Sequence, residues 1–483
     1  MYDVIVIGGG PAGVTAALRS CELGAKVALV ERARLGGTCT NDGCVPTRVL
    51  AKAARLVREA EQFETYGLIA PPPSIDFPRL LAQTQRTVYR IHEKKQLIDH
   101  LEQAGVTVFT NAGAAQFVDA HTIRLGDGSQ LEAEKLIISA GGRARRISFP
   151  GSEYALTHSE IWSLPRLPSS LIIIGGAATG CQVASIFASF GVRVAILEMN
   201  TRLLGLEDAA VGQAIQDAFL QRGLQVVSGI GAVERIEKQE QQLNVHYTLH
   251  DQPERLQAEA VLIAAGWPGN VDTLNLEAAG VESQRGFIVV NDYLQTSAAH
   301  IFAAGDITGR MMLVQSAGHE ARVAAENAIL GAGQAFNHQI VPHGGFTDPE
   351  YASVGLTEER ARSQGIEYLA ATVPYADLDR AIIDYHPQGF CKLIVSQENH
   401  RILGAHVVGE QAMEVVHLVA AGMTADMWIE QLAEMEIAYP TYSAVVGLAA
   451  RKLVRDLGVM PLAPQWRALG RPHAAEWERS EGE

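Results

Sequence analysis

The chain alternates short apolar runs with glycine-rich turns and stretches of helical character. Val4 to Ile7 is apolar, Gly8 to Gly13 is a glycine turn, an alanine-rich stretch reaches Leu23, and Val27 to Val30 is apolar again. Apolar runs of about four to eight residues that alternate with helix-forming segments are typical of a parallel sheet covered by helices. The pattern therefore predicts an α/β protein.

The same pattern occurs a second time further along the chain. Leu171 to Ile174 is an apolar run that leads into another glycine turn, a helical stretch and a further apolar run. Gly8 and Glu31 are 23 residues apart, and so are Gly175 and Glu198. A shared spacing of this kind indicates two copies of one nucleotide-binding unit.

Each glycine turn is suited to hold the phosphates of a dinucleotide. The first glycine makes the tight turn, the second lets the backbone approach a pyrophosphate, the third lets the helix pack on the strand, and a following acid accepts from a ribose hydroxyl. Ala177 replaces the second glycine of the second copy, where its methyl group would crowd the phosphates. A tight strand–helix turn without a ligand is the alternative for the first copy. The expected nucleotide-binding residues are Gly8, Gly10, Gly13 and Glu31, and in the second copy Gly175, Gly180 and Glu198.

Three further apolar runs end in glycine, as expected of strands beside a bound nucleotide. They end at Gly141, Gly266 and Gly305, and Asp306 follows the last of them. This order predicts a first nucleotide-binding domain over residues 1–150 that is interrupted by a second over residues 151–270. The first domain then resumes over residues 271–335.

The sequence pattern changes after Pro342, and the mixture of strands and helices there predicts an α+β domain over residues 340–460. Residues 461–483 are polar and are expected to form a tail on the surface. The expected elements of the α+β domain are strands near Ala352 to Leu356 and Phe390 to Val395, and helices at Glu358 to Gln364 and Met413 to Ala421.

Two of the five cysteines, Cys39 and Cys44, lie within six residues, directly after the first nucleotide unit. Pro46 suits the first position of a helix expected from about Thr47 to Phe63. Cys44 would then lie at a helix N-terminus, where the dipole and free N–H groups stabilise a thiolate. Two small core residues in a glycine-rich loop are the alternative, and zinc is disfavoured because no other Cys or His pair has ligand spacing. No chemistry is assigned to the other three, which are Cys21 and Cys391, expected in the interior, and Cys181, expected in the helix of the second unit.

Composition narrows the classes of function. Lys and Arg number 39 against 54 Asp and Glu, so the chain carries a net charge of -15 and lacks the basic surface that nucleic acid requires. No uncharged apolar run reaches the roughly 18 residues that span a bilayer. Asp3 at the start and the small number of cysteines argue against a signal peptide and a disulfide scaffold. A cytoplasmic enzyme without a nucleic-acid, membrane or resident metal partner is expected.

Three segments are distinctive beside the two glycine turns: GGTCTNDGCVP at 36–46, AAGD at 303–306 and FTDPEYASVGLTEE at 346–359. In these features the sequence resembles the flavoprotein disulfide reductase family, the group of dihydrolipoamide dehydrogenase, glutathione reductase and mercuric reductase. The resemblance covers about residues 1–460. It implies FAD on the first unit, with Glu31 at the adenosine ribose and Asp306 at the ribityl chain, NAD(P)H on the second unit, and a homodimer built through the C-terminal domain.

The resemblance also implies an electron path. Hydride passes from nicotinamide to flavin and then to the Cys39–Cys44 disulfide, with Cys44 as the charge-transfer thiolate and Cys39 as the interchange thiol that meets the acceptor. A two-electron carrier between a hydride donor and a disulfide agrees with this order. Gly37 and Thr38, which directly precede Cys39, are further candidates for binding the flavin nucleotide.

The chain departs from the family at the acceptor site. Disulfide-reducing members carry His-Pro-Thr-x-x-Glu, contributed by the partner subunit, with the histidine as general base, whereas this chain has Tyr439 and Ala444 at those two positions. A phenol of pKa about 10 is a poor base at neutral pH, and losing a positioned base typically costs about 10² to 10⁴ in rate. Lipoamide and glutathione disulfide are therefore disfavoured. Mercuric reductases also place a tyrosine there, but this chain lacks a Cys-Cys pair in its tail, and Tyr439 either handles substrate or only packs in an interface.

A second departure concerns charge beside the flavin. Arg48 stands where the family usually has lysine, and Gln182 replaces the glutamate that pairs with it. An unopposed cation favours the anionic reduced flavin, and one charge at about 5 Å with an effective dielectric near ~20 is worth roughly 3 kcal/mol, or some ~70 mV for a two-electron couple. A flavin potential above that of lipoamide dehydrogenases is expected, unless another carboxylate or solvent compensates Arg48.

The second unit favours NADH, because Glu198 accepts from a free ribose 2′-hydroxyl and repels a 2′-phosphate. Arg202, one helical turn further, would favour NADPH instead, and Trp267 replaces an arginine that is usual in the family. We expect electrons to pass from NADH to a thiol-reactive metal ion such as Hg(II) or to a quinone-like acceptor. The alternatives are a disulfide reductase with an unusual substrate and a flavin-bearing redox sensor or partner subunit without turnover.

Overall fold

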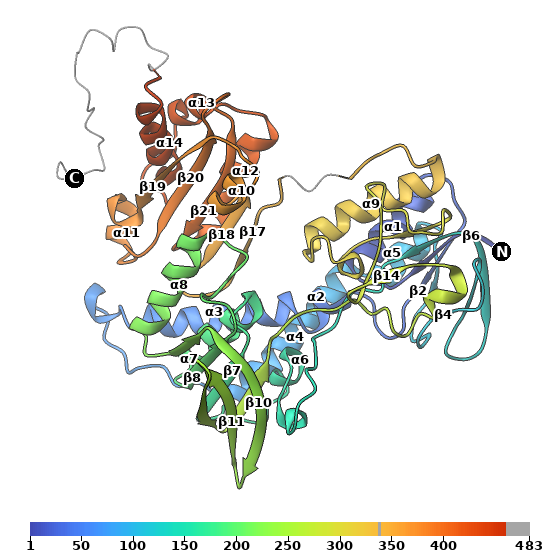
Figure 1. The fold of residues 1–483 in the computed structure, drawn as a ribbon, viewed down its shortest axis with the longest axis horizontal. Helices are drawn as coiled ribbons and strands as arrows, with labels where there is room; N and C mark the ends of the chain where they lie inside the picture. Colours follow the sequence, from blue (N-terminus) through green and yellow to red (C-terminus); the bar gives the residue numbers. More distant parts are fainter. Residues whose placement is uncertain (337–339, 460–483) are drawn as a thin grey trace.

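The computed structural model describes residues 1–336 and 340–459. Figure 1 shows three lobes, which are a first α/β domain, a second α/β domain and a C-terminal domain. The sheet of the first domain has seven strands, and its central strands are parallel. From edge to edge they are β3 (Thr107–Phe109), β2 (Val27–Val30), β1 (Tyr2–Ile7), β6 (Gln130–Ile138), β5 (Thr122–Arg124) and β4 (Gln116–Phe117), with β16 (Ile301–Ala303) paired to β6.

The chain leaves this sheet after β6, builds the second domain and returns with β16, so the predicted insertion of one nucleotide-binding domain in the other is confirmed. A short hairpin of β14 (Ser283–Gln284) and β15 (Phe287–Ile288) precedes the return. The helices of the first domain are α1 (Pro11–Glu22), α2 (Gly37–Asn41), α3 (Cys44–Ala60), α4 (Phe77–Lys95), α5 (Leu97–Gln103) and α9 (Val314–Leu330), with one-turn helices at Glu64–Tyr66, Leu276–Ala279 and Asp306–Thr308.

The second domain repeats the architecture on a smaller scale. Its four-stranded sheet is parallel throughout, and a three-stranded antiparallel sheet is attached to it. The parallel strands are β13 (Ala260–Ile263), β7 (Ser170–Ile174), β8 (Arg193–Glu198) and β9 (Gln225–Ser228); the antiparallel ones are β10 (Ile230–Gln239), β11 (Gln242–Leu249) and β12 (Gln252–Ala258); the helices are α6 (His158–Ile161), α7 (Ala178–Ser189) and α8 (Ala209–Gln221), with a one-turn helix at Ser152–Tyr154.

The C-terminal domain is a five-stranded antiparallel sheet with helices packed on it, which confirms the predicted α+β class. The predicted tail, residues 461–483, lies outside the described residues. The sheet runs β17 (His343–Gly345), β18 (Tyr351–Gly355), β21 (Ile402–Val408), β20 (Phe390–Ser396) and β19 (Tyr368–Pro374), and the helices are α10 (Glu358–Ser363), α11 (Asp379–Ile383), α12 (Ala412–Thr424), α13 (Ile429–Glu434) and α14 (Ala444–Asp456), with a one-turn helix at Tyr375–Asp377.

The continuous apolar run of β1 is explained by a sheet that is covered on both faces. Val4 and Val6 pack in the core formed with α1 and α9, whereas Ile5 and Ile7 pack in the core on the opposite face. All four side chains are buried because successive residues of a strand point to opposite sides. Figure 1 shows α1 and α9 together on one face of this sheet.

Helix α3 begins at Cys44 and ends at Ala60, three residues earlier at each end than expected. Pro46 is the third helical residue and not the first. Proline is tolerated there because the N–H groups of the first turn have no partner within the helix. The first backbone hydrogen bond runs from Thr47 N to Gly43 O (3.0 Å), and the Thr47 hydroxyl donates to the same oxygen (2.8 Å).

The far end of α3 joins the three domains through a buried ionic cluster. Arg58 pairs with Asp348 and with Glu410 (3.0 Å), which both belong to the C-terminal domain. Arg222, directly after α8 of the second domain, also pairs with Asp348 (2.6 Å). Only 11% of the Arg58 side chain and 6% of the Glu410 side chain are exposed, so these charges are shielded from water. In the described part of the chain no helix is long and apolar enough to cross a membrane.

Candidate functional site

The first glycine turn leaves an open backbone at the start of α1. Gly8 has a φ of +108°, and a side chain on Gly13 would overlap the carbonyl oxygen of Gly8. A Cβ on Gly10 would meet only the Cα of Gly37, at 3.7 Å, so this position is free for a close approach from outside. The Glu31 carboxylate, which ends the unit, accepts from Gly9 N (2.7 Å) and Ala33 N (2.9 Å). Each Glu31 oxygen retains a free lone pair for a ribose hydroxyl.

The second turn has the same construction. Gly175 has a φ of +112°, and a side chain on Gly180 would overlap the Gly175 carbonyl. Glu198 accepts from Gly176 N (2.5 Å) and from the backbone and side-chain N–H groups of Asn200 (both 2.7 Å). The second carboxylate therefore accepts one hydrogen bond more than Glu31 does.

Ala177 leaves the backbone of the second turn unchanged. Its φ and ψ are -81° and -173°, against -76° and -174° at Gly10, and its side chain is exposed. The alanine therefore costs the turn nothing in backbone conformation, and only its methyl group differs from the first copy.

The loop that holds the two cysteines packs against the first glycine turn. Gly37 has a φ of +57°, and a side chain on it would lie 2.8 Å from the Cα of Gly10. Thr38 closes the loop, since its carbonyl oxygen accepts from Asp42 N (3.0 Å) and Gly43 N (2.7 Å). This packing places α2, which contains Cys39, beside the expected phosphate site.

Cys39 and Cys44 are both free thiols and interact with each other. A hydrogen bond from Cys39, aided by the backbone N–H of Cys44 itself, lowers the pKa of Cys44 to about 7 against the effect of burial. The same hydrogen bond, together with burial, raises the pKa of Cys39. The pair therefore favours a thiolate at Cys44 with a protonated Cys39 as its donor, and Cys44 is the first residue of α3, where the helix dipole also favours negative charge.

The other cysteines are less reactive in their surroundings. Burial raises the pKa of Cys181 and raises that of Cys391 to about 12. Both side chains are fully buried, whereas Cys21, which we expected in the interior, is partly exposed.

Asp306 lies in the first domain where β16 ends, next to Trp267 from the second. The Trp267 indole N–H donates to Asp306 Oδ2 (2.9 Å), and burial raises the pKa of Asp306 despite this bond. Trp267 covers Gly142, while Gly141, with a φ of +66°, has no atom within 4 Å of an added Cβ. A buried carboxylate of this kind gains from one more donor, such as a ribityl hydroxyl.

Gly266 follows the strand β13 of the second domain, three residues after its end, at the same junction. Its φ is +123°, and an added Cβ would meet the Arg145 guanidinium at 3.1 Å. The Arg145 backbone N–H also donates to the Gly266 carbonyl (3.0 Å). Gly266 therefore joins the segment that follows β6 to the segment that follows β13.

The expectation of an unopposed charge at Arg48 is wrong. Arg48 Nη1 lies 3.0 Å from Glu350 Oε1, and the guanidinium lies 4.6 Å from the centroid of the Phe346 ring. Gln182 does not replace this partner, since its oxygen accepts from Phe346 N (3.2 Å) and its amide donates to Ala178 O (3.0 Å). Glu350 belongs to the segment FTDPEYASVG, so the sequence contained the carboxylate but gave no sign that it would face α3.

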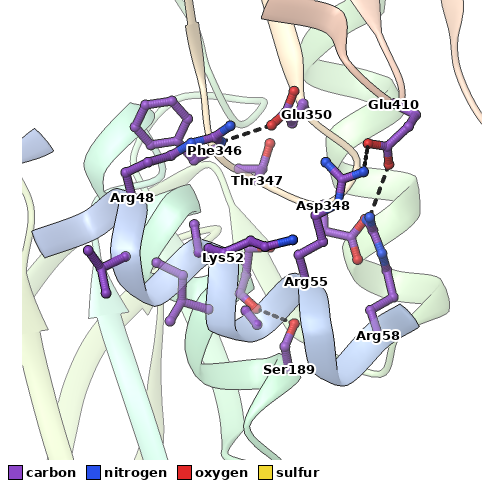
Figure 2. A pocket seen from close by; sticks show the side chains of 15 residues that line it. Arg48, Lys52, Arg55, Arg58, Ser189, Phe346, Thr347, Asp348, Glu350 and Glu410 are labelled. Atoms are coloured by element: carbon purple, nitrogen blue, oxygen red, sulfur yellow. Dashed lines mark hydrogen bonds and ion pairs between the residues drawn. The ribbon is translucent and has the colours of Figure 1, made fainter. Parts of the chain in front are cut away.

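Arg48, Phe346 and Glu350 line one end of a cavity of about 480 Å³ between α3, α7 and residues 346–350. Figure 2 shows Arg48, Phe346 and Glu350 at that end, and Arg58, Asp348 and Glu410 at the other. Arg55 also pairs with Glu410, so the cationic face of α3 is largely matched by carboxylates of the C-terminal domain.

Tyr439 lies in the C-terminal domain, and 57% of it is exposed. Its hydroxyl donates to Asp379 Oδ2 at 2.5 Å. Tyr442 makes a similar bond to Asp384 Oδ2 (3.0 Å). The phenol that stands in the place of the family histidine is thus paired with a carboxylate from α11, a partner that the sequence did not suggest.

The sequence also gave no sign of the contacts between Asp42, in the loop between the cysteines, and the segment around α6. Ser159 Oγ donates to Asp42 Oδ2 (2.5 Å), Trp162 Nε1 donates to Asp42 O (3.2 Å), and His158 Nε2 lies 3.9 Å from Asp42 Oδ2. Burial lowers the pKa of His158. The chain crossing from the first domain to the second therefore holds the redox loop in place.

Comparison with known proteins identifies the family. The family model of the pyridine nucleotide-disulphide oxidoreductases matches residues 2–321, and the model of their dimerisation domain matches residues 341–450. The chain belongs to this family. Mercuric reductase from Lysinibacillus sphaericus is 31% identical over 459 residues, covering 94% of this chain and 83% of that one. Dihydrolipoyl dehydrogenase from Geobacillus stearothermophilus is 34% identical over 456 residues, covering 93% and 95%.

A solved structure is similar along nearly the whole length of this oxidoreductase. The HOCl-induced flavoprotein disulfide reductase RclA from Escherichia coli has a TM-score of 0.82 and 29% identity, covering 93% of this chain and 99% of its own, and it has also been solved as a Cu(II) complex. The family is FAD-dependent and uses NAD(P)H. The open turn at Gly10, the free lone pairs of Glu31 and the buried carboxylate of Asp306 fit FAD in the first domain. Because the relatives differ in acceptor at similar identity, the acceptor has to be argued from the site.

Proposed function

We propose that this oxidoreductase passes electrons from NADH through FAD and the Cys39–Cys44 pair to a thiol-reactive metal ion such as Hg(II). The observation that carries the proposal is the thiol pair itself, in which a hydrogen bond from Cys39 lowers the pKa of Cys44 to about 7 at the start of α3. Bound FAD supplies the hydride acceptor between nicotinamide and sulfur. The protein acts as a homodimer through the domain at residues 341–450.

The residues of this chain divide the work at the pair. Cys44 holds the negative charge that two-electron reduction leaves on one sulfur, and Cys39 keeps the proton until the acceptor arrives. In the resting state these two sulfurs form a disulfide, and transfer of the electron pair to the acceptor restores that bond. Asp42 and its partners on the α6 segment keep the loop in position through both states.

The choice of NADH rests on the second glycine turn. The Glu198 side chain is buried, and its negative charge faces the place of the ribose 2′-position. Arg202, which would favour a 2′-phosphate, lies in an irregular segment after β8 and not one helical turn further along a helix. It donates to Gly205 O (3.1 Å) and Glu207 O (3.0 Å), so it is turned toward that loop.

The metal acceptor is favoured over a disulfide because no histidine stands at position 439. The Tyr439 hydroxyl donates a hydrogen bond to Asp379 and so does not act as a base toward an incoming disulfide. A metal ion bound by thiolates needs no such base, since the Cys39 sulfur replaces one of its ligands directly. A quinone-like acceptor also needs none, and it would take electrons from the flavin without the thiols.

An acceptor panel tests the proposal. Anaerobic mixing with NADH is expected to reduce the flavin within seconds. A flavin that stays oxidised for minutes would support the alternative of a redox sensor without turnover. Hg(II) turnover is expected in the wild type and not in Cys39→Ser, with lipoamide at least about 10²-fold slower because the base is missing. Quinone turnover that is retained in Cys39→Ser would mean that the flavin passes electrons to the quinone without the thiols.

A disulfide reductase is the second candidate, and the similarity to dihydrolipoyl dehydrogenases and to RclA supports it. It predicts that a disulfide substrate turns over faster than Hg(II). It also predicts that the disulfide remains the faster substrate in the Tyr439→His variant. Cu(II) belongs in the same panel, since RclA has been solved in complex with this ion. If Cu(II) is reduced and the reduction depends on Cys39, the acceptor is still a thiol-reactive metal ion, but it is Cu(II) and not Hg(II).

A further inference from the structure

Basic side chains surround the loop that carries Cys39, on the side of α4. Lys95 Nζ donates to Thr40 Oγ1 (3.3 Å), and His92 Nε2 lies 2.8 Å from Asn41 Oδ1. Arg34 donates to the same Asn41 oxygen from Nε (3.0 Å) and Nη2 (2.7 Å). Figure 1 places α2 beside α4, so the last turn of α4 reaches the residues that directly follow the thiol.

The charges of this group are not matched by acids. Within residues 1–336 and 340–459, neither Arg34 nor Lys95 has a carboxylate at ion-pair distance. The Arg34 guanidinium is instead held over the Tyr89 ring, 5.6 Å from its centroid. Arg48 and Arg58 of α3 differ from Arg34 and Lys95, since each of them faces a carboxylate of the C-terminal domain.

Two neighbouring groups respond to the positive potential. Burial lowers the pKa of His92, and the charges of Arg34 and Lys95 lower it further. Lys95 also favours the thiolate form of Cys39, while the charge of Asp306 opposes it. His92 is therefore neutral at pH 7, and the fixed charges beside the thiol are those of the arginine and the lysine.

We propose that Arg34 and Lys95 form an anion-recognition site beside the Cys39 thiol, so that the acceptor reaching this thiol carries negative charge. The inference rests on the proposed function, in which Cys39 is the thiol that meets the acceptor. Opposite charge at the mouth of a site attracts its ligand, whereas the net charge of this protein would otherwise repel an anion. Neutral and cationic acceptors gain nothing from this arrangement.

For a thiol-reactive metal ion, the fitting form is a complex with two carboxylate-bearing thiolates. The bond between the metal and one ligand sulfur breaks as the bond to the Cys39 sulfur forms. The displaced ligand leaves with its electron pair and takes up the proton that the Cys39 thiol loses, and no atom changes oxidation state in this exchange. Arg34 and Lys95 would bind the ligand carboxylates while the metal changes partners.

The test compares an anionic and a neutral reagent at the same sulfur. The reduced holoenzyme is treated with iodoacetate or with iodoacetamide, and the rate constant at Cys39 is followed by mass spectrometry. The same thiolate attacks both reagents and displaces iodide from each, so the ratio of the two rate constants cancels any change in the pKa of Cys39. We expect this ratio to exceed that of free 2-mercaptoethanol by about three- to tenfold and to fall toward it at high salt.

Matched variants separate charge from structure. Lys95→Gln is expected to lower the ratio about two- to fivefold, whereas Lys94→Gln, the same change at the neighbouring residue, is expected to leave it unchanged. Arg34→Lys retains the charge and should preserve the ratio, and Arg34→Gln should lower it. A ratio equal to that of 2-mercaptoethanol, or one unaffected by Lys95→Gln and Arg34→Gln, overturns the proposal.

A second measurement distinguishes this inference from the proposed function. Initial rates are compared for Hg(II) bound to two equivalents of 3-mercaptopropionate and for Hg(II) bound to two of 2-mercaptoethanol. The wild type is expected to prefer the first complex and Lys95→Gln to lose that preference. Absence of Hg(II) turnover with an intact alkylation ratio rejects the metal acceptor alone, while turnover without any preference in the wild type rejects the anion site alone.

Discussion

Arg48 Nη1 and Glu350 Oε1 form an ion pair at 3.0 Å that links the helix of the reactive cysteine to the C-terminal domain. Position 182 is a glutamine and carries no negative charge, so Glu350 of the C-terminal domain supplies the carboxylate that balances the charge of Arg48. Because FAD is expected beside Arg48, removing the carboxylate should favour the anionic reduced flavin. Glu350→Gln is therefore expected to raise the flavin potential, by less than ~70 mV since 52% of the Arg48 side chain is exposed.

A redox titration of the holoenzyme against a dye of known potential measures this shift. Gln182→Glu, which adds a carboxylate on the other side, should lower the potential from that of the wild type. Glu359→Gln, an exposed acid of the same domain, serves as the matched control. Equal potentials in Glu350→Gln and wild type would mean that the flavin does not sense Arg48.

The reactivity of Cys44 should follow its hydrogen bond with Cys39. Iodoacetamide alkylation of Cys44 in the reduced protein is expected to increase with a midpoint near pH 7, because the thiolate prevails above a pKa of about 7. Cys39→Ala removes the donor, so the midpoint should rise toward the ordinary value of about 8.5 and the rate at pH 7 should fall roughly tenfold. Cys39→Ser retains a donor, and an equal upward shift in this variant would contradict the role of the hydrogen bond.

Lys392 neutralises a buried acid between the second domain and the C-terminal domain. Its Nζ lies 2.7 Å from Asp208 Oδ1 and 2.6 Å from Glu358 Oε1, and only 2% of the Asp208 side chain is exposed. Lys392→Met leaves the Asp208 charge buried without this partner, at a cost of about 3–5 kcal/mol. The thermal unfolding midpoint is expected to fall by roughly 3–5 °C, because an unfolding entropy of about 2.1 cal/mol/K per residue makes 1 kcal/mol worth about 1 °C in a chain of this length. Lys452→Met, at a partly exposed lysine, should change the midpoint little. A similar fall in this variant would mean that the loss of any positive charge destabilises the protein.

Glu198 is expected to set the preference for coenzyme. Glu198→Gln keeps an oxygen that accepts from Gly176 N but removes the negative charge. The ratio of kcat/KM for NADPH to that for NADH should rise about tenfold, which corresponds to ~1.4 kcal/mol. Steady-state kinetics with both coenzymes provide the measurement, with the exposed Asp217→Asn as control. An unchanged ratio would mean that other residues of the second domain discriminate between NADH and NADPH.

Local patterns were sufficient to predict most of the architecture. The apolar run Val27 to Val30 is β2 with the expected bounds, and the glycine turns produce two nearly identical helix starts at Gly10 and Ala177. The reactive position of Cys44 could be inferred because a helix N-terminus and a nearby second thiol are both sequence-local features. Helix α3 begins and ends three residues earlier than expected, and its early start shows that proline suits the whole first turn and not its first position alone.

Long-range pairing was beyond the sequence. Glu350 lies 302 residues from Arg48, and Asp379 lies 60 residues from Tyr439. The alternation of polar and apolar residues fixes which face of a strand or helix is buried. It does not determine which carboxylate of another domain will meet a given guanidinium, because that depends on how whole domains dock.

Helix α3 carries the reactive sulfur at one end and the Arg58 cluster at the other, about 21 Å apart at the usual rise per residue. A helix of this kind behaves as a stiff rod, so it cannot move at one end alone. Any tilt of the C-terminal domain relative to the rest of the subunit would therefore displace the thiolate as well. The assembly of subunits through this domain and the chemistry at the sulfur both depend on the position of α3.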